Sequence, residues 1–177
     1  RTTADTRDDL WVLPVADGAS ATPYAMAPFN QIYAVLAPDG RSLAYASDES
    51  GKFDIYVDAF PTPGARIRVT TAGGTEPRWR GDGRELYFRR GSEIHAVSFG
   101  TPARSTSAGP AGGRRIELGS SERLFDAGAT IRAYDASADG RRFLLNLPAA
   151  SSAPSVATLV VNWQANASHG NTDTRKR

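Results

Sequence analysis

One short turn motif occurs three times in this 177-residue sequence and constrains the fold more than any other feature. The three copies are Asp39-Gly40-Arg41, Asp82-Gly83-Arg84 and Asp139-Gly140-Arg141. The first two aspartates are 43 residues apart and the last two are 57 apart. In such a turn the Asp side chain accepts backbone hydrogen bonds, and Gly tolerates a positive φ. We therefore predict a structural role for these three aspartates and three glycines, each followed by an apolar residue that starts a strand (Leu43, Leu86 or Phe143).

Short stretches of alternating or clustered apolar residues on both sides of each turn predict strands, and no helical periodicity is present. The expected strands are residues 10–15, part of 19–30, 31–36, 43–46, 53–57, 65–70, 76–79, 86–88, 93–97, 123–125, 131–136, 143–145 and 156–163. The strand at 65–70 has the features of an edge strand and carries Arg66 and Arg68 on one face. Residues 100–121 are rich in Gly, Ser, Pro and Ala, so a long flexible loop is expected there.

A repeat of about 40–45 residues that contains four strands is typical of β-propeller blades. The longer second interval is explained by additional residues in the 100–121 loop. We predict an all-β fold, a partial β-propeller of about three to four four-stranded antiparallel blades over residues 10–163. A two-sheet sandwich is the alternative, but it does not predict turns in register. Residues 1–9 are expected to be frayed, and residues 164–177 to form a disordered polar tail.

The composition excludes several classes of protein. With 40% hydrophobic and 23% charged residues, the chain can bury a core. The formal net charge is +2 and the arginines are scattered, so no nucleic-acid partner is expected. The absence of cysteine excludes disulfides, thiolate metal sites and a cysteine nucleophile. The chain begins at Arg1 without an initiator Met or a signal peptide, which we interpret as a truncated piece of a longer protein.

The residue types that usually carry catalysis are sparse. His95 lies in an expected strand and His169 in the tail, so they cannot form a metal site together. We expect His95 to be a surface or partly packed strand residue. No Gly-x-Ser-x-Gly motif is present, and a serine hydrolase is therefore unsupported. We predict no catalytic residue, no metal ligand and no cofactor.

An acidic patch is formed by residues on and around the 47–52 loop, namely Asp48, Glu49, Asp54 and Asp58. A cation site is one interpretation, but the spacing of these carboxylates fits no calcium loop. Solvated loop carboxylates are the interpretation that we favour.

Aromatic side chains on the expected strands should fill the space between neighbouring sheets. These residues are Trp11, Tyr45, Tyr56, Trp79, Tyr87, Phe88 and Phe143. A protein or small-ligand partner would then bind at the rims or in the central channel. The candidate rim loops are residues 47–52, 71–75, 89–92 and 127–130.

The chain resembles the TolB-like family of six-bladed β-propellers. Three motifs carry this resemblance: Pro38-Asp39-Gly40-Arg41, Leu43-Ala44-Tyr45 and Ile55-Tyr56-Val57. It is most similar to the C-terminal propellers of bacterial transmembrane Ser/Thr protein kinases. That similarity is carried by the stretches 57–61, 73–79, 82–88, 134–137, 139–144 and 160–163. The second and third turns lack the turn proline, and the chain holds fewer blades than a complete member of the family.

The resemblance implies a non-catalytic scaffold for protein or ligand binding, in the C-terminal sensor or regulatory region of a bacterial Ser/Thr kinase. Its partners would include the remaining blades of the parent chain, on the extracytoplasmic side of a bacterial inner membrane. The sequence contains no kinase motif, so kinase activity would belong to an upstream region of the parent. The alternatives are an accessory propeller of a prolyl oligopeptidase-type peptidase and a free-standing TolB-like envelope protein.

Overall fold

The computed structural model describes residues 7–64, 66–100 and 117–149, and in this part of the chain every regular element is a β-strand. The strands are β1 (Leu10–Val12), β2 (Thr22–Ala25), β3 (Gln31–Leu36), β4 (Ser42–Ser47), β5 (Asp54–Ala59), β6 (Ile67–Arg68), β7 (Thr75–Trp79), β8 (Glu85–Arg90), β9 (Glu93–Gly100), β10 (Glu117–Asp126), β11 (Ala133–Ala136) and β12 (Phe143–Asn146). The predicted all-β class is confirmed. Among the described residues, no helix is long and apolar enough to cross a membrane.

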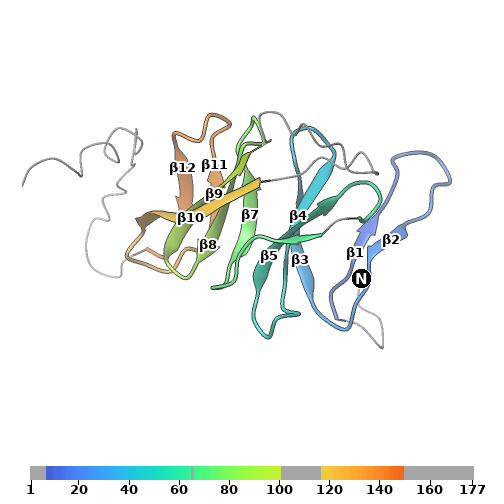
Figure 1. Ribbon diagram of the computed structural model, residues 1–177, viewed down its shortest axis with the longest axis horizontal. Coiled ribbons are helices and arrows are strands. Elements are labelled where there is room, and N and C mark those ends of the chain that lie inside the picture. The colour runs from blue at the N-terminus through green and yellow to red at the C-terminus, as the bar shows by residue number, and fades with distance from the viewer. Residues whose placement is uncertain (1–6, 65, 101–116, 150–177) are drawn as a thin grey trace, which may run out of the picture.

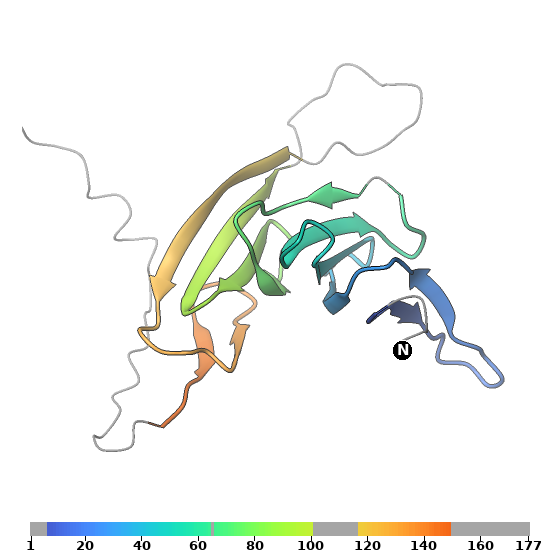
Figure 2. The same cartoon turned by 90° about the horizontal axis from the view of Figure 1, so that it is seen from below.

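The strands form four antiparallel sheets that follow the order of the chain. A sheet of β1 and β2 comes first, followed by the four-stranded sheets β3-β4-β5-β6 and β7-β8-β9-β10 and by the pair β11-β12. Within each sheet, every strand pairs with its neighbour in sequence. The sheets stand side by side in this order (Figure 1), and together they follow an arc (Figure 2). Each strand is therefore followed along the chain by its partner in the same sheet or by the first strand of the next sheet.

Three hydrophobic clusters hold neighbouring sheets together. The first, between β1-β2 and the second sheet, contains Tyr24, Leu43, Tyr45 and Tyr56. The second, between the two four-stranded sheets, contains Ala44, Ala46, Ile55, Val57, Leu86 and Phe88. The third, between the third sheet and β11-β12, contains Tyr87, Ile94, Ala96, Ile131, Tyr134 and Phe143. Successive side chains of a strand point to opposite faces, so each central sheet contributes to two clusters.

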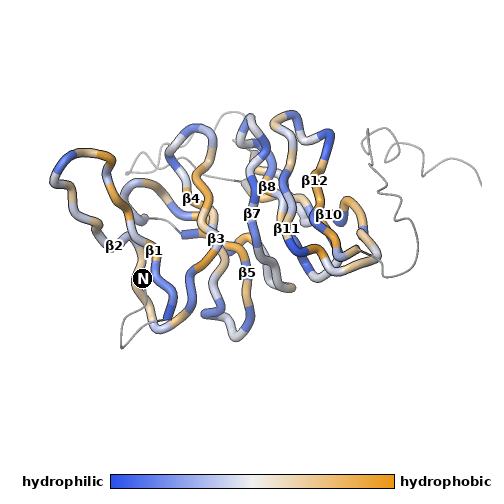
Figure 3. Tube along the Cα trace, turned by 180° about the vertical axis from the view of Figure 1, so that it is seen from behind, coloured by the Kyte–Doolittle hydropathy of each residue, from blue (hydrophilic) through white to orange (hydrophobic). Residues whose placement is uncertain are grey.

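The central strands β4 and β8 show this alternation directly. Tyr45 packs in the first cluster and its neighbours Ala44 and Ala46 pack in the second. Tyr87 packs in the third cluster, against Phe143 with ring centroids 5.0 Å apart, whereas Phe88 packs in the second. Burial on both faces explains why these strands are apolar in consecutive positions rather than in alternate ones. Hydrophilic residues are common in the connecting turns and also along β7 (Figure 3).

Most of the predicted aromatic residues lie between the sheets. Tyr45, Tyr56, Tyr87, Phe88 and Phe143 are buried in the three clusters. The two tryptophans of β1 and β7 are only partly buried, and the second of them contacts Phe99 with ring centroids 4.9 Å apart. The inter-sheet spaces are thus filled mainly by tyrosine, phenylalanine and aliphatic side chains.

Several element boundaries differ from the prediction. β6 has two residues where an edge strand at 65–70 was expected, and β1 ends at Val12 rather than at residue 15. The predicted flexible loop at 100–121 is wrong for residues 117–121, because β10 begins at Glu117 and pairs with β9. An edge strand with two register shifts tolerates the small residues of that segment. Residues 101–116, the expected strand at 156–163 and the tail at 164–177 lie outside the described residues.

The predicted frayed start does not extend to residue 9. The carbonyl of Asp8 accepts a hydrogen bond from the backbone N–H of Gln31 at 2.7 Å, and Asp9 is buried. Asp8 is therefore tied to the first residue of β3, and Asp9 is packed into the fold.

Candidate ligand-binding site

The three Asp-Gly-Arg turns have the same geometry. Oδ1 of Asp39, Asp82 and Asp139 accepts a hydrogen bond from the backbone N–H two residues later, at 2.9, 2.9 and 3.0 Å respectively. The glycine that follows each Asp has a φ of +66° to +69°. These contacts close each turn on itself, so the aspartates are structural groups.

Turns of successive sheets also touch one another, and we call residues 37–41, 80–84 and 137–141 the turn rim. The backbone N–H of Gly81 donates to the carbonyl of Ala138 at 2.9 Å. A Cβ at Gly83 would lie 3.7 Å from Pro38 Cδ, and one at Gly140 would overlap the hydroxyl of Tyr87. Equivalent turns, far apart in sequence, are thus neighbours in space.

Arg80 is the charged group that fixes the middle turn. Its Nε and Nη2 donate to the two carboxylate oxygens of Asp82 at 2.8 and 2.6 Å, and its Nη1 lies 3.0 Å from Glu85 Oε2. The hydrogen bonds from Arg80 are the main reason that the pKa of Asp82 falls to about 2. At neutral pH this carboxylate is therefore ionised and accepts hydrogen bonds from within its own turn.

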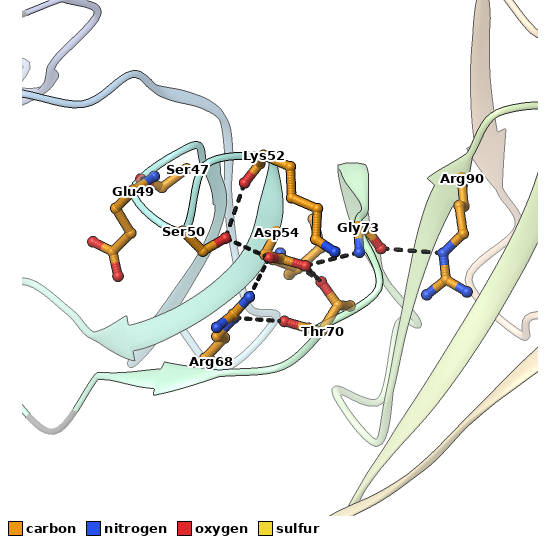
Figure 4. Close-up of polar contacts among 10 residues, drawn as sticks. Ser47, Glu49, Ser50, Lys52, Asp54, Arg68, Thr70, Gly73 and Arg90 are labelled. Carbon is orange, nitrogen blue, oxygen red and sulfur yellow. Dashed lines mark hydrogen bonds and ion pairs between the residues drawn. The ribbon is translucent and has the colours of Figure 1, made fainter.

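The opposite ends of the sheets carry irregular connections, and we call residues 47–53, 71–74, 89–92 and 127–130 the loop rim. Its centre is Asp54, whose side chain is completely buried. Oδ2 of Asp54 accepts hydrogen bonds from Ser50 Oγ at 2.7 Å and Arg68 Nη2 at 2.6 Å. Oδ1 accepts from Thr70 Oγ1 and the Gly73 N–H, both at 2.9 Å. Figure 4 shows these four donors converging on the carboxylate.

The Asp54 network extends to the next sheet. The carbonyl of Gly73 accepts a hydrogen bond from Arg90 Nε at 3.2 Å (Figure 4). Burial opposes ionisation of Asp54, but its hydrogen bonds with Ser50, Arg68, Thr70 and Gly73 outweigh that effect and lower its pKa. One carboxylate therefore connects β5, β6 and the connection to β7.

The solvated carboxylates predicted for the acidic patch are wrong for Asp54 and Asp58, which are both buried. Oδ1 of Asp58 accepts hydrogen bonds from the backbone N–H groups of Ala59 and Gly64 at 2.7 and 2.8 Å. The alternative of a cation site finds no support either, because each carboxylate of the patch already accepts a hydrogen bond or forms an ion pair within the protein. Within the described residues, no group of three or more His, Cys, Asp or Glu is placed to hold a metal ion.

His95 is more buried than a surface residue and has structural partners. It is 5% exposed and stacks on Phe88 with ring centroids 5.4 Å apart. Its Nε2 lies 2.9 Å from Glu93 Oε2, and the other oxygen of Glu93 accepts a hydrogen bond from Arg123 at 2.9 Å. The imidazole thus stacks on one aromatic ring and contacts a carboxylate that is itself paired with an arginine.

A polar pocket of about 510 Å³ lies beside the Asp54 network. Phe29, Glu49, Ser50, Tyr56, Arg66 and Arg68 line what we call the β6 pocket. Arg66 Nη1 lies 2.9 Å from Glu49 Oε2, and its guanidinium lies 5.2 Å from the centre of the Tyr56 ring. The sequence indicated only that the two arginines share a face. It gave no indication that Phe29, which precedes β3, would join them.

A second depression, of about 350 Å³, lies on the β11-β12 sheet. Its lining includes Asp135, Phe143 and Leu144, the last of which is 76% exposed. It offers fewer charged groups than the β6 pocket, which is therefore our candidate binding site.

No protein-family model matches the sequence, and no curated protein matches it either. The resemblance to TolB-like propellers therefore stays a prediction, and functional inference depends on the geometry described above.

Proposed function

We propose that this chain is a series of consecutive β-propeller blades that acts as a non-catalytic binding scaffold. The observation that carries this proposal is the packing of four antiparallel sheets face to face in chain order. A two-layer sandwich has a single interface between its sheets, whereas here three successive interfaces follow one another. The contacts between equivalent turns on the turn rim support the same interpretation.

A backbone irregularity repeats with the same period and supports the proposal independently. Tyr33 and Glu76, which are 43 residues apart, are the two non-glycine residues with positive φ among those described, at +57° and +53°. Each lies at a register shift in the first strand of its four-stranded sheet. Because the two bulges occupy equivalent positions, the sheets repeat in local distortion as well as in strand order.

The polar clusters favour a scaffold over an enzyme, because their charged side chains are held by other groups of the protein. Glu76 is buried and pairs with Arg89 at 2.5 Å, and its carbonyl accepts a hydrogen bond from Tyr134 at 2.7 Å. Asp54 and His95 are likewise held by neighbouring side chains. We propose further that the parent protein is a bacterial Ser/Thr kinase and that this region serves as its sensor or regulatory part.

The architecture is tested by determining the structure of this region together with the residues that flank it in its gene. We expect further sheets that close the arc into a ring. A two-layer sandwich or an open, uncurved stack would refute the propeller. Reading the gene upstream tests the parent, where a kinase catalytic domain is expected, and a Gly-x-Ser-x-Gly domain downstream would indicate a peptidase instead.

The absence of catalysis is tested by incubating the purified chain with chromogenic esters and peptides. We expect no turnover above a heat-denatured sample. Hydrolysis by the native chain that disappears in a folded His95→Ala variant would overturn the non-catalytic assignment.

A further inference from the structure

We propose that the β6 pocket binds the carboxylate group of a small organic acid, with the apolar part of that acid against Phe29. The volume of about 510 Å³ lies within the range of roughly 300–1,000 Å³ that is usual for small-ligand sites. This inference refines the proposed scaffold role by giving one ligand class and one site.

Arg68 is the arginine of the pocket that is bonded to a buried carboxylate. Its Nη2 is held by the buried Asp54 at 2.6 Å, and its Nε donates to the carbonyl of Thr70 at 3.0 Å. These two hydrogen bonds do not involve its Nη1, and the side chain is 39% exposed. One edge of the guanidinium is therefore fixed by the protein while further N–H donors remain for a ligand.

Arg66, the second arginine of the pocket, is also held by protein contacts and is partly exposed. Its Nη1 is 2.9 Å from Glu49 Oε2, its guanidinium stacks over the buried Tyr56, and its side chain is 41% exposed. A guanidinium has five N–H donors in a planar fork that matches the two oxygens of a carboxylate. Both arginines are ordered by protein contacts before a ligand arrives, which reduces the entropy lost on binding.

The remaining lining residues decide what else the ligand carries. Glu49 and Asp54 are each engaged with an arginine, so a cation would compete with an existing ion pair, whereas an anion meets donors that are not fully used. Phe29 is 37% exposed and presents an aromatic surface at the same pocket. An acid with a flat or apolar body would cover that ring and leave its carboxylate to the arginines.

The test uses N-acetylphenylalanine as the probe, titrated into the purified chain and followed by NMR chemical shifts. We expect saturable shifts centred on Phe29, Tyr56, Arg66 and Arg68. The uncharged N-acetylphenylalanine amide should bind at least about tenfold more weakly, because it loses charge-assisted hydrogen bonds. A short peptide that ends in Phe, with a free or an amidated C-terminus, distinguishes a peptide end from a free acid as the source of the carboxylate.

Variants place the effect in the pocket. Arg66→Gln should weaken binding about tenfold and Phe29→Ala about threefold. Arg123→Gln is the matched control, because Arg123 also forms a 2.9 Å ion pair with a glutamate but lies outside the pocket. Equal binding of acid and amide, equal losses in Arg66→Gln and Arg123→Gln, or shifts with inorganic phosphate as large as those with the acid would each overturn the proposal. A closed ring of sheets without carboxylate binding would refute this site and leave the scaffold role intact.

Discussion

The connections on the turn rim and on the loop rim are stabilised by hydrogen bonds of different range. On the turn rim, each connection is closed by an aspartate that binds the backbone two residues later, and one solution is used three times. On the loop rim, Asp54 collects donors from positions 4 to 19 residues away in sequence. Each turn of the turn rim is therefore closed by a hydrogen bond within that turn, whereas the loop rim is held by contacts between different elements.

This difference separates the architecture from the candidate site. The hydrogen bond that closes each turn lies within the turn, so the same turn can recur in a stack of similar units. The long-range contacts of the buried Asp54 carboxylate belong to one sheet, and the β6 pocket forms beside them. Binding specificity would then belong to the loop rim, beside the Asp54 network.

The largest expected effect on stability comes from removing the Asp54 carboxylate at the centre of the loop rim. Asp54→Ala leaves Arg68, Ser50, Thr70 and the Gly73 N–H without their shared acceptor. We expect the free energy of unfolding to fall by about 3–5 kcal/mol, because removing one partner of a buried charged network is strongly destabilising. Urea denaturation monitored by tryptophan fluorescence measures this loss.

Asp39→Ala is the control from the turn rim. It removes an acceptor from an exposed turn, where the Arg41 N–H can bind water instead. A loss of about 1 kcal/mol or less is expected. Equal losses in the two variants would show that the contrast between the rims is not energetic.

A pair of glycines on the turn rim gives the next largest effect. Gly40 and Gly140 occupy the same turn position with φ of +66° and +69°, but only Gly140 faces a neighbouring sheet. Ala at Gly40 meets open space and should cost about 1–2 kcal/mol for the left-handed backbone alone. Ala at Gly140 must also displace the buried Tyr87 hydroxyl and Arg80 Cδ, so about 2–4 kcal/mol is expected.

Thermal or urea unfolding of both glycine variants measures the difference between them. The excess loss at Gly140 reports contact between sheets, since the strain within the two turns is matched. If Gly40→Ala were as destabilising as Gly140→Ala, the turns of successive sheets would not be in contact in solution.

The repeated part of the fold was predictable because its signals are local. The turn residues and the strands on either side of them follow from backbone conformations that Asp and Gly favour, and most expected strands are present within the described residues. The strand at 117–121 was missed because its Gly and Ser residues have low strand propensity, and only pairing with β9 makes them a strand.

The candidate site was not predictable in the same way. Asp54 is followed by an apolar strand and resembles any carboxylate at a loop end, and its burial depends on Arg68 and Thr70 from another strand and connection. Phe29 joins the pocket from the connection between β2 and β3. Sequence alternation placed the two arginines on one face, but it could not identify what that face contacts.

The smallest expected effect isolates the charge of one turn. Asp82→Asn keeps an oxygen that can accept from the Arg84 N–H, but it removes the ion pair with Arg80. The pKa of Asp82 is lowered from 3.8 to about 2 in the folded protein, so its ionised form stabilises the fold above pH 4. That contribution is lost as the pH falls from about 4 towards 2.

Because the side chain is 44% exposed and screened by water, we expect a difference of only about 1 kcal/mol between wild type and variant at pH 7. Urea unfolding at pH 7 and pH 2.5 should show this difference shrinking in acid, whereas a gap that is constant with pH would mean that the turn is stabilised by geometry and not by charge.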